Sequence, residues 1–303
     1  MQNNTTLSNM TQPYIYRAYN IDFETLFTVE LYTYIVTSIC SFVGNLLVIL
    51  TVYKNKNLQT SNNYFIVSMS VSDILFPLFM LIDYSLFRRF IQLSKLVDNL
   101  LCKLLPFVNN VSYGVSMLTL VAITVFRFSA IMFPMRARLP NKRKRLLVLL
   151  LTWLIPMAIC SPYLIYNEFN EKLQSCIWEL NSKLKRIWII ALLSLFHFLP
   201  LLIMLVLYPL IIIKLKQHRA PGNVINFQAV IRRKGHNYRM TMMFIVITVA
   251  FLLCWGPYII LYLLEYVIEH NLDWCIFIYF SFIASITRVV FHAIHPMIYF
   301  IFL

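Results

Sequence analysis

Seven long apolar segments constrain the fold of this chain more than any other feature of its sequence. They cover residues 28–53, 63–87, 99–132, 145–166, 187–214, 238–264 and 275–302. A helix needs about 20 apolar residues to cross the hydrocarbon core of a bilayer, and each segment is long enough. We therefore predict an all-α membrane protein, a seven-transmembrane helix bundle that forms one domain over residues 28–303 and follows a polar tail over residues 1–27.

Composition supports the same class of protein. The chain is 60% hydrophobic and only 13% charged, with a mean hydropathy of +0.73. A soluble protein of this composition could not cover its surface with polar groups, so the bilayer is expected to be its solvent. The six cysteines are too few for a disulfide scaffold, and there is no CxxC motif or Cys/His cluster. We therefore expect no metal site and no cofactor.

The stretch from Leu100 to Pro134 indicates how the bundle is oriented. Cys102 and Arg127 are separated by about 37 Å along a helix, at about 1.5 Å per residue, so they are expected near opposite membrane faces. A cysteine forms a disulfide only on the oxidising side, whereas a run of basic residues follows Arg127. The Cys102 end is therefore expected outside the cell and the Arg127 end in the cytoplasm.

The loops give an independent indication of the orientation. Those assigned to the cytoplasm carry basic residues and no acidic ones, whereas the outer segments mix both charges. The basic residues are Lys54, Lys56, Arg136, Arg138, Lys142, Arg143, Lys144, Arg145, Lys214, Lys216, Arg219, Arg232, Arg233, Lys234 and Arg239. This asymmetry follows the positive-inside rule, with the N-terminus outside and the C-terminus inside. It explains the net charge of +14 without a nucleic acid partner.

The polar N-terminal tail contains matches to the N-glycosylation pattern at Asn3, Asn4 and Asn9. They predict an extracellular, glycosylated tail. No basic-then-apolar signal peptide precedes the first span, so we expect that span to act as its own insertion signal.

Polar groups and prolines inside the spans form a pattern. Buried polar groups are costly in lipid, so each one requires a partner or a task. The pattern comprises Asn45, Asp73, the Cys102-to-Arg127 spacing, Trp153, Pro200 with Tyr208, Cys254-Trp255-Gly256-Pro257 and Pro296-x-x-Tyr299. In these residues the chain from Thr28 to Leu303 resembles the rhodopsin-like (class A) G-protein-coupled receptors, and in particular those for neuropeptides.

The resemblance implies a plasma-membrane receptor that passes a signal from an extracellular ligand to a heterotrimeric G protein. It implies a disulfide between Cys102 and Cys176. It also implies that ligand binding shifts the packing around Trp255 and swings the inner end of the sixth helix outward, at the bend that Pro257 allows. The other residues expected to act in activation are Asn45, Asp73, Ser116, Arg127, Pro200, Tyr208, Phe251, His295, Pro296 and Tyr299.

Two departures from the family pattern carry expectations of their own. Phe126 precedes Arg127 where the family usually has an acid, and no acid lies near the base of the sixth helix. A buried arginine without a counter-charge is costly, so we predict a weakly restrained inactive state and raised basal activity. His295 replaces the usual Asn before Pro296 and can donate to Asp73. A sodium site at Asp73 and Ser116 is therefore doubtful.

The outer halves of the spans contain the candidate ligand contacts. Asn109 and Asn110 stand where amine receptors have an acid, so a monoamine would lack its salt bridge, and the seventh segment has no lysine for a retinal Schiff base. The candidates, besides Trp255, are Asp83, Tyr84, Asn109, Asn110, Tyr113, His197, Tyr258, Tyr262, Glu265 and Arg288. Asp83 and Arg288 either pair as a structural bridge or contact a cationic group and an anionic or carbonyl group of the ligand.

Two features of the outer loops favour a peptide ligand. Glu265, Glu269 and Asp273 form an acidic rim near the third outer loop, which is either functional or merely solvated. The second outer loop, about Asn167 to Lys185, is long and resembles the hairpin of peptide receptors. We therefore predict a short basic or amidated peptide.

Three other functions are alternatives to a peptide receptor that couples to G protein. A receptor-shaped protein that binds ligand without coupling to G protein is the main alternative, because of Phe126. A transporter is disfavoured because no internal repeat is evident and Asp73 is the one clear acid at the midplane. An enzyme is disfavoured because no Ser/His/Asp, paired-carboxylate or metal constellation occurs on one face. The chain stops shortly after Tyr299, so it is either a fragment or a receptor with doubtful arrestin coupling.

Overall fold

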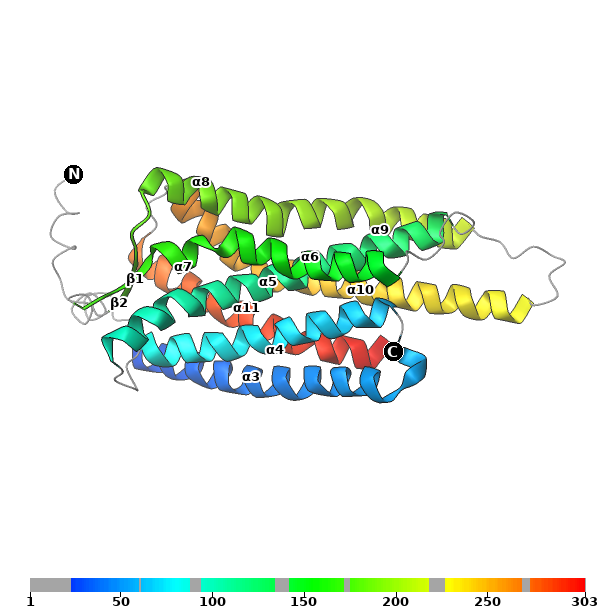
Figure 1. Ribbon diagram of the computed structural model, residues 1–303, viewed down its shortest axis with the longest axis horizontal. Helices are drawn as coiled ribbons and strands as arrows, with labels where there is room; N and C mark the ends of the chain where they lie inside the picture. Colours follow the sequence, from blue (N-terminus) through cyan, green and yellow to red (C-terminus); the bar gives the residue numbers. More distant parts are fainter. Residues whose placement is uncertain are drawn as a thin grey trace.

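The computed structural model describes residues 23–59, 61–87, 94–133, 142–171, 175–217, 227–268 and 273–302. Within this part of the chain, seven helical spans are long and apolar enough to cross a membrane: Glu24–Lys54, Asn63–Tyr84, Lys95–Met132, Arg143–Tyr166, Ser182–Gln217, Gly235–Glu265 and Cys275–Phe302. They run side by side along the long axis of the molecule (Figure 1). The predicted seven-helix bundle is confirmed, whereas Asn3, Asn4, Asn9 and Glu269 lie outside the described residues.

Some spans are single helices and others are interrupted. The first three spans are α3 (Phe23–Lys54), α4 (Ser61–Phe87) and α5 (Lys95–Met132), and the short 3₁₀ turn η1 (Lys56–Leu58) follows α3. The fourth is α6 (Lys142–Cys160) with α7 (Pro162–Tyr166), and the seventh is α11 (Trp274–Phe302). The fifth joins α8 (Ser182–Leu193), the π-helical turn η2 (Ser194–Phe198) and α9 (Leu199–Gln217). The sixth joins α10 (Phe227–Tyr262) and the π-helical turn η3 (Leu263–Val267).

Helix α10 begins at Phe227, well before the predicted span at residue 238. The reason is that the apolar run marks only the length that lipid can cover, whereas backbone hydrogen bonding continues into water. In Figure 1 this end of α10 projects beyond the other helices.

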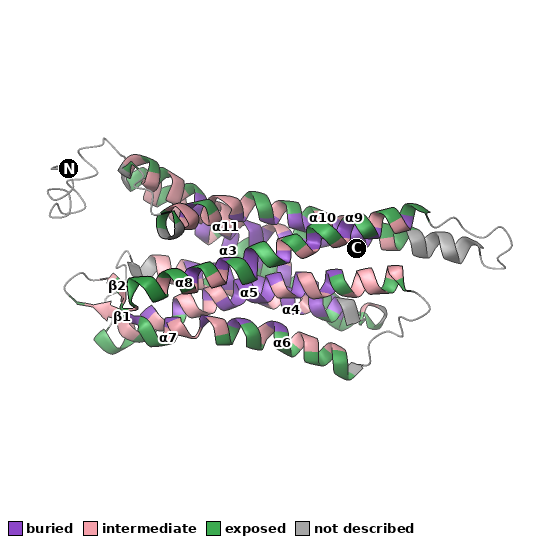
Figure 2. Cartoon of the chain, turned by 90° about the horizontal axis from the view of Figure 1, so that it is seen from above, coloured by how far each residue is buried: buried purple, intermediate pink, exposed green. Residues whose placement is uncertain are grey.

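The interior of the bundle contains aromatic, aliphatic and small polar side chains, and its outer surface is largely apolar. Buried residues line the inward faces of the helices, while exposed residues lie on the outside (Figure 2). The exposed residues include many large aliphatic side chains, such as Leu253 and Ile301, as expected for a surface that lipid covers. The largest buried side chains include Tyr34, Phe65, Phe76, Met117, Phe244, Phe251, Phe291 and Tyr299.

Gly44 is needed where α3 crosses α11. A Cβ atom built on Gly44 would lie 2.6 Å from Cγ of Pro296. The absence of a side chain therefore lets the two backbones approach, so that groups on α3 can reach α11.

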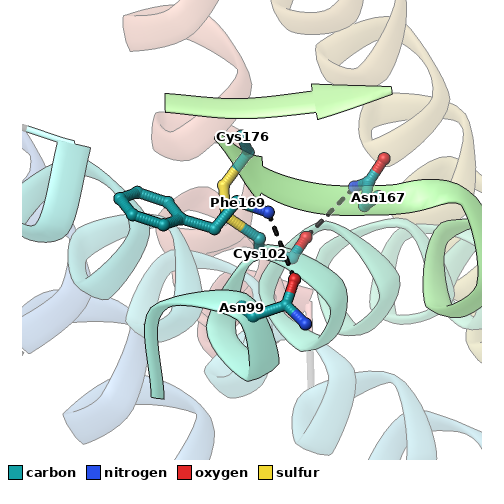
Figure 3. Close-up of a disulfide and its surroundings, with 5 residues drawn as sticks. All are labelled: Asn99, Cys102, Asn167, Phe169 and Cys176. Carbon is teal, nitrogen blue, oxygen red and sulfur yellow. Dashed lines mark hydrogen bonds between the residues drawn. A yellow bond between two sulfur atoms is a disulfide. The ribbon is translucent and has the colours of Figure 1, made fainter. Parts of the chain in front are cut away.

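A β-hairpin covers one end of the bundle. Strands β1 (Asn167–Asn170) and β2 (Ser175–Trp178) pair antiparallel, with Phe169 opposite Cys176. The Cys102–Cys176 disulfide joins β2 to α5, and two hydrogen bonds support it (Figure 3). The amide of Asn167 donates to the Cys102 carbonyl oxygen at 3.1 Å, and Phe169 N–H donates to Asn99 Oδ1 at 3.2 Å. The predicted disulfide and hairpin are confirmed.

Candidate functional site

A cavity lies directly beneath the hairpin, between α4 and α5. Its volume is about 290 Å³, and its wall includes the disulfide drawn in Figure 3. Two acidic residues, Asp83 and Asp98, line this cavity. Among the described residues neither carboxylate forms an ion pair. The cavity therefore offers two acidic side chains that a cationic group can neutralise.

Arg288 of α11 does not bridge to Asp83; no ion pair joins these two described residues. Instead its guanidinium lies over aromatic rings, 4.3 Å from the Tyr258 centroid, 5.8 Å from Phe76 and 5.9 Å from Trp255. Its Nε has no hydrogen-bond partner in the described part of the chain. Its Nη2 donates to Met80 Sδ at 3.9 Å, a weak acceptor, and cation–π attraction holds the group without satisfying Nε. Arg288 thus remains able to bind an acceptor.

Trp255 forms the floor beneath Arg288. Its ring centroid lies 3.9 Å from that of Tyr113 and 5.9 Å from that of His197. Phe76, Phe251, Tyr258 and His292 surround the same indole within 6.2 Å. Rings from five segments of the bundle therefore meet at one layer, and a shift of Trp255 must disturb most of them.

Pro200 explains how Tyr113 is held. A proline has no N–H, so Pro200 leaves the carbonyl group of Phe196, four residues earlier, without its helical donor. The Tyr113 hydroxyl donates to that carbonyl oxygen at 3.0 Å. The π-helical turn η2 lies at the same place, just before Pro200. The proline predicted to act in activation is thus linked to a predicted ligand contact.

The other predicted ligand contacts are spread over several environments. Asn109 Nδ2 faces Met80 Sδ at 3.3 Å, and Asn110 Nδ2 donates to the Pro106 carbonyl oxygen of its own helix at 2.8 Å. Both ring nitrogens of buried His197 lack partners among the described residues. The Tyr262 ring lies 4.4 Å from that of Tyr258 in a tilted arrangement, and Glu265 is exposed in η3.

Tyr84 lies apart from these contacts. Its ring packs against Phe27 and Tyr34 of α3, and its hydroxyl donates to the Phe27 carbonyl oxygen at 3.3 Å. It therefore fastens α4 to α3 instead of facing the aromatic layer.

Asp73 forms the buried polar centre of the bundle. His292 Nδ1 lies 2.8 Å from its Oδ1, and His295 Nδ1 lies 2.6 Å from its Oδ2. The Ser116 hydroxyl donates to Oδ1 at 3.1 Å and also contacts the Ser72 hydroxyl at 2.8 Å. Both carboxylate oxygens therefore have partners, from α5 and α11.

The donor set around Asp73 does not fit a sodium ion. A hard cation requires oxygen ligands with free lone pairs, whereas here two imidazole nitrogens occupy the approaches to both carboxylate oxygens. The sequence suggested that His295 contacts Asp73, and its Nδ1 lies within hydrogen-bond distance of that carboxylate; His292 adds a second contact.

Asn45 braces this centre from α3. Its Nδ2 donates to the Ser41 carbonyl oxygen at 3.0 Å and to the His292 carbonyl oxygen at 3.4 Å. The Ser41 hydroxyl donates to the backbone oxygen of Asp73 at 2.6 Å. Ser41 therefore joins α3 to the helix that carries Asp73, and Asn45, where Gly44 lets α3 approach α11, joins α3 to the helix that carries His292.

Arg127 lies toward the end of the bundle away from the hairpin and is held much more weakly than Asp73. Its Nη1 donates to Asn237 Oδ1 at 3.4 Å, and its Nε has no partner among the described residues. The neighbouring residue, Phe126, packs against Phe65 with 5.4 Å between ring centroids. As a phenylalanine it offers Arg127 no counter-charge. Nearby, the Tyr208 hydroxyl lies 2.9 Å from the Thr124 hydroxyl, whereas the buried Tyr299 hydroxyl has no partner in the described part of the chain.

Several residues of these sites were not assigned a role from the sequence: Ser41, Ser72, Asp98, Thr124, Asn237 and His292. Only His292 gave a usable signal. It lies one helical turn before His295, and residues three apart share a helix face. The others belong to common residue types, and their partners lie on different helices.

Comparisons with known proteins find similar sequences over most of this chain. The profile of the 7 transmembrane receptor (rhodopsin family) matches residues 44–299. A QRFP-like peptide receptor of Branchiostoma floridae is 29% identical over 244 residues, which cover 76% of this chain and 63% of that protein. Neuropeptide receptor 22 of Caenorhabditis elegans is 28% identical over 284 residues, covering 88% of this chain and 65% of that one.

The human growth hormone secretagogue receptor type 1 is 31% identical over 228 residues, covering 71% of this chain. The matches span 63%, 65% and 60% of the lengths of these three relatives. The similarity thus covers most of this chain and a smaller share of each relative.

Proposed function

This chain belongs to the rhodopsin family of seven-transmembrane receptors, and from that membership we propose that it converts binding of an extracellular peptide into activation of a heterotrimeric G protein. It is a multi-pass membrane protein, and we place it in the plasma membrane with the hairpin outside. The family consists of receptors, and we propose no enzymatic role. The relatives named as peptide receptors support the choice of ligand class.

The observation that carries the proposal is the separation of unpaired charges in the outer half. Asp83 and Asp98 line the cavity under the hairpin, while Arg288 lies over aromatic rings with its Nε unpartnered among the described residues. A peptide that carries both a cationic side chain and a carbonyl or amide acceptor would satisfy both groups at once. A short basic or amidated peptide has that chemistry.

Signal transmission would begin at Arg288. Because its guanidinium contacts both Tyr258 and Trp255, an acceptor that draws it outward would change the packing of the Trp255 layer. Pro257 lies two residues after Trp255 on α10. It provides the bend about which the inner end of that helix would swing. Arg127, whose Nη1 makes a long hydrogen bond to Asn237, would then be released for the G protein.

The test is G-protein activation in cells that express this chain, first without ligand and then with a library of short basic and amidated peptides. The Arg127→Ala variant is measured in parallel. Signal that disappears in Arg127→Ala at equal surface expression would support a coupled receptor. Silence in both, with peptide binding retained, would favour the receptor-shaped protein that does not couple.

Charge-neutralising variants test the ligand contacts separately. Asp83→Asn should weaken the potency of an active basic peptide at least tenfold, about 1.4 kcal/mol, because it removes the counter-charge for the cationic group. Glu265→Gln should act in the same direction. Glu179→Gln, at an exposed outer position, is the matched control and should have little effect. Equal losses of potency and surface expression in Asp83→Asn would indicate a structural role instead.

A further inference from the structure

The layer around Arg288 contains hydrogen-bond donors that lack good acceptors. Arg288 Nε and Trp255 Nε1 each carry a hydrogen for which the described part of the chain offers no acceptor. Asn109 Nδ2 and Arg288 Nη2 contact the same sulfur atom, Met80 Sδ, at 3.3 Å and 3.9 Å. A thioether sulfur is a weak acceptor. Donors from three residues are therefore left without a strong partner among the described residues.

These donors come from different helices and meet in one layer. Asn109 belongs to α5, Trp255 to α10 and Arg288 to α11, while Met80 belongs to α4. Asn109 and Trp255 are only 5% and 2% exposed, so bulk water does not reach them freely. The guanidinium carbon of Arg288 lies 5.9 Å from the centre of the Trp255 ring. A buried N–H group without an acceptor is costly, and a single acceptor in this layer would serve several donors at once.

The layer also carries a positive charge that no contacting carboxylate neutralises. The rings around Arg288, of which Tyr258 is the nearest at 4.3 Å, attract the guanidinium but accept none of its N–H hydrogens in the plane of the group. Asp83 lies one helical turn from Met80 on α4, and no ion pair joins it to Arg288 within the described residues. A cation with free donors in apolar surroundings favours an anion as its partner.

We propose that Arg288, Asn109 and Trp255 bind a chloride ion when no peptide is bound. A chloride ion accepts N–H donors from several directions and requires no donor in return. Its single charge matches the one guanidinium, and a monoatomic ion fits a layer in which Trp255 is closely surrounded by aromatic rings. Met80 is unbranched and flexible, so its sulfur can turn aside and leave the donors to the ion.

The ion has a consequence for the peptide, and this consequence rests on the proposed function. Chloride would occupy the acceptor position at Arg288 that we assign to a carbonyl or amide oxygen of the peptide. Chloride and the peptide should therefore compete, and replacing chloride by a larger organic anion should raise the potency of an active peptide. The binding of the ion itself does not depend on signalling.

The test uses the purified chain in phosphatidylcholine nanodiscs. Sodium gluconate is replaced in steps by sodium chloride, so that sodium and ionic strength stay constant, and the thermal midpoint is measured at each step. For the unmodified chain we expect a saturable rise of the midpoint with chloride, because the ion binds the folded protein. Arg288→Gln should require at least tenfold more chloride for half of the rise, and Asn109→Leu at least threefold more. A rise that is unchanged in Arg288→Gln would overturn the proposal.

Two further variants separate a specific site from general attraction. Lys183→Gln removes one positive charge from an exposed position at the same end of the bundle, and its half-saturation should stay within about twofold of the unmodified chain. Asp83→Asn removes a nearby negative charge and should tighten chloride binding at least threefold, opposite in sign to Arg288→Gln. Equal weakening in Arg288→Gln and Lys183→Gln, or weaker binding in Asp83→Asn, would contradict an ion at Arg288. Each variant is compared with itself in gluconate, so a change in its overall stability does not affect the result.

Other anions identify the occupant. Bromide should replace chloride at similar concentration, whereas sulfate and phosphate should not, because they are polyatomic and carry more charge. An equal rise of the midpoint with sulfate would indicate a general salt effect and would contradict the proposal. The readout is ion binding, so failure of the proposed peptide signalling would leave it intact. Chloride binding without any effect on the potency of an active peptide would instead contradict the peptide contact assigned to Arg288.

Discussion

Two charged side chains, Asp73 and Arg127, lie at different depths in the bundle, and their surroundings differ. Asp73 is fully buried and has partners on both oxygens, within 3.1 Å, from His292, His295 and Ser116. Arg127 is partly buried and, within the described part of the chain, makes one hydrogen bond of 3.4 Å to an uncharged amide. Both are predicted from the sequence to act in activation, yet only Asp73 is firmly held.

The difference follows from what each charge costs. A fully buried carboxylate is tolerated only with close donors, whereas a guanidinium near the end of a helix can keep part of its hydration. The network around Asp73 therefore fastens α4, α5 and α11 together, while the weak contact of Arg127 with Asn237 leaves α5 and α10 easier to separate. The inner end of the bundle is thus the part expected to move.

The largest expected effect is a difference in stability between two matched deletions of charge. Asp73→Leu removes the acceptor of two imidazoles and a hydroxyl, and breaking such a buried pair costs about 3–5 kcal/mol. Arg127→Leu removes one long hydrogen bond and should cost no more than about 1 kcal/mol. Thermal midpoints of the two purified variants check this. A similar loss in both would mean that Arg127 is as firmly held as Asp73.

A smaller effect is expected when Arg127 is given the counter-charge that it lacks. Phe126→Asp places a carboxylate beside the guanidinium, which should stabilise the inactive arrangement by about 0.5–1 kcal/mol and lower basal G-protein signalling two- to fivefold. Basal activity is measured at equal surface expression, without ligand. Phe126→Asn is the control, since it loses the same packing against Phe65 without gaining charge. Basal signalling in Phe126→Asp that is no lower than in the unmodified chain and in Phe126→Asn would contradict the weakly restrained inactive state.

The smallest effect concerns sodium. Replacing choline chloride by sodium chloride at constant ionic strength should leave the thermal midpoint of the unmodified chain unchanged, because imidazoles occupy both oxygens of Asp73. In His292→Ser/His295→Asn, which supplies oxygen ligands instead, sodium should stabilise the protein by about 1.4 kcal/mol at ten times its Kd. Asp73→Asn added to that variant should abolish the gain. Sodium stabilisation of the unmodified chain would show that an ion can displace the imidazoles.

The number of spans, their approximate positions and the family could all be predicted from the amino-acid sequence. Lipid requires a long apolar run for every crossing, and this requirement leaves a direct record in composition. The disulfide and the likeness of the outer loop to a hairpin could also be predicted, because the residues at Cys102 and Cys176 match the family pattern. Departures such as Phe126 and His295 were visible as single substitutions.

Which side chains contact one another could be learned from the fold alone. His292 and Asp73 lie 219 positions apart, and Arg127 and Asn237 lie 110 apart, so no local pattern records either pair. The same is true of Arg288, which the sequence left between a bridge to Asp83 and a ligand contact, and which the fold placed over Tyr258. Hydropathy is a sum over neighbouring residues and specifies how deep a helix lies in lipid. The rotation of each helix against the others, which brings particular side chains together, depends on packing across the whole bundle.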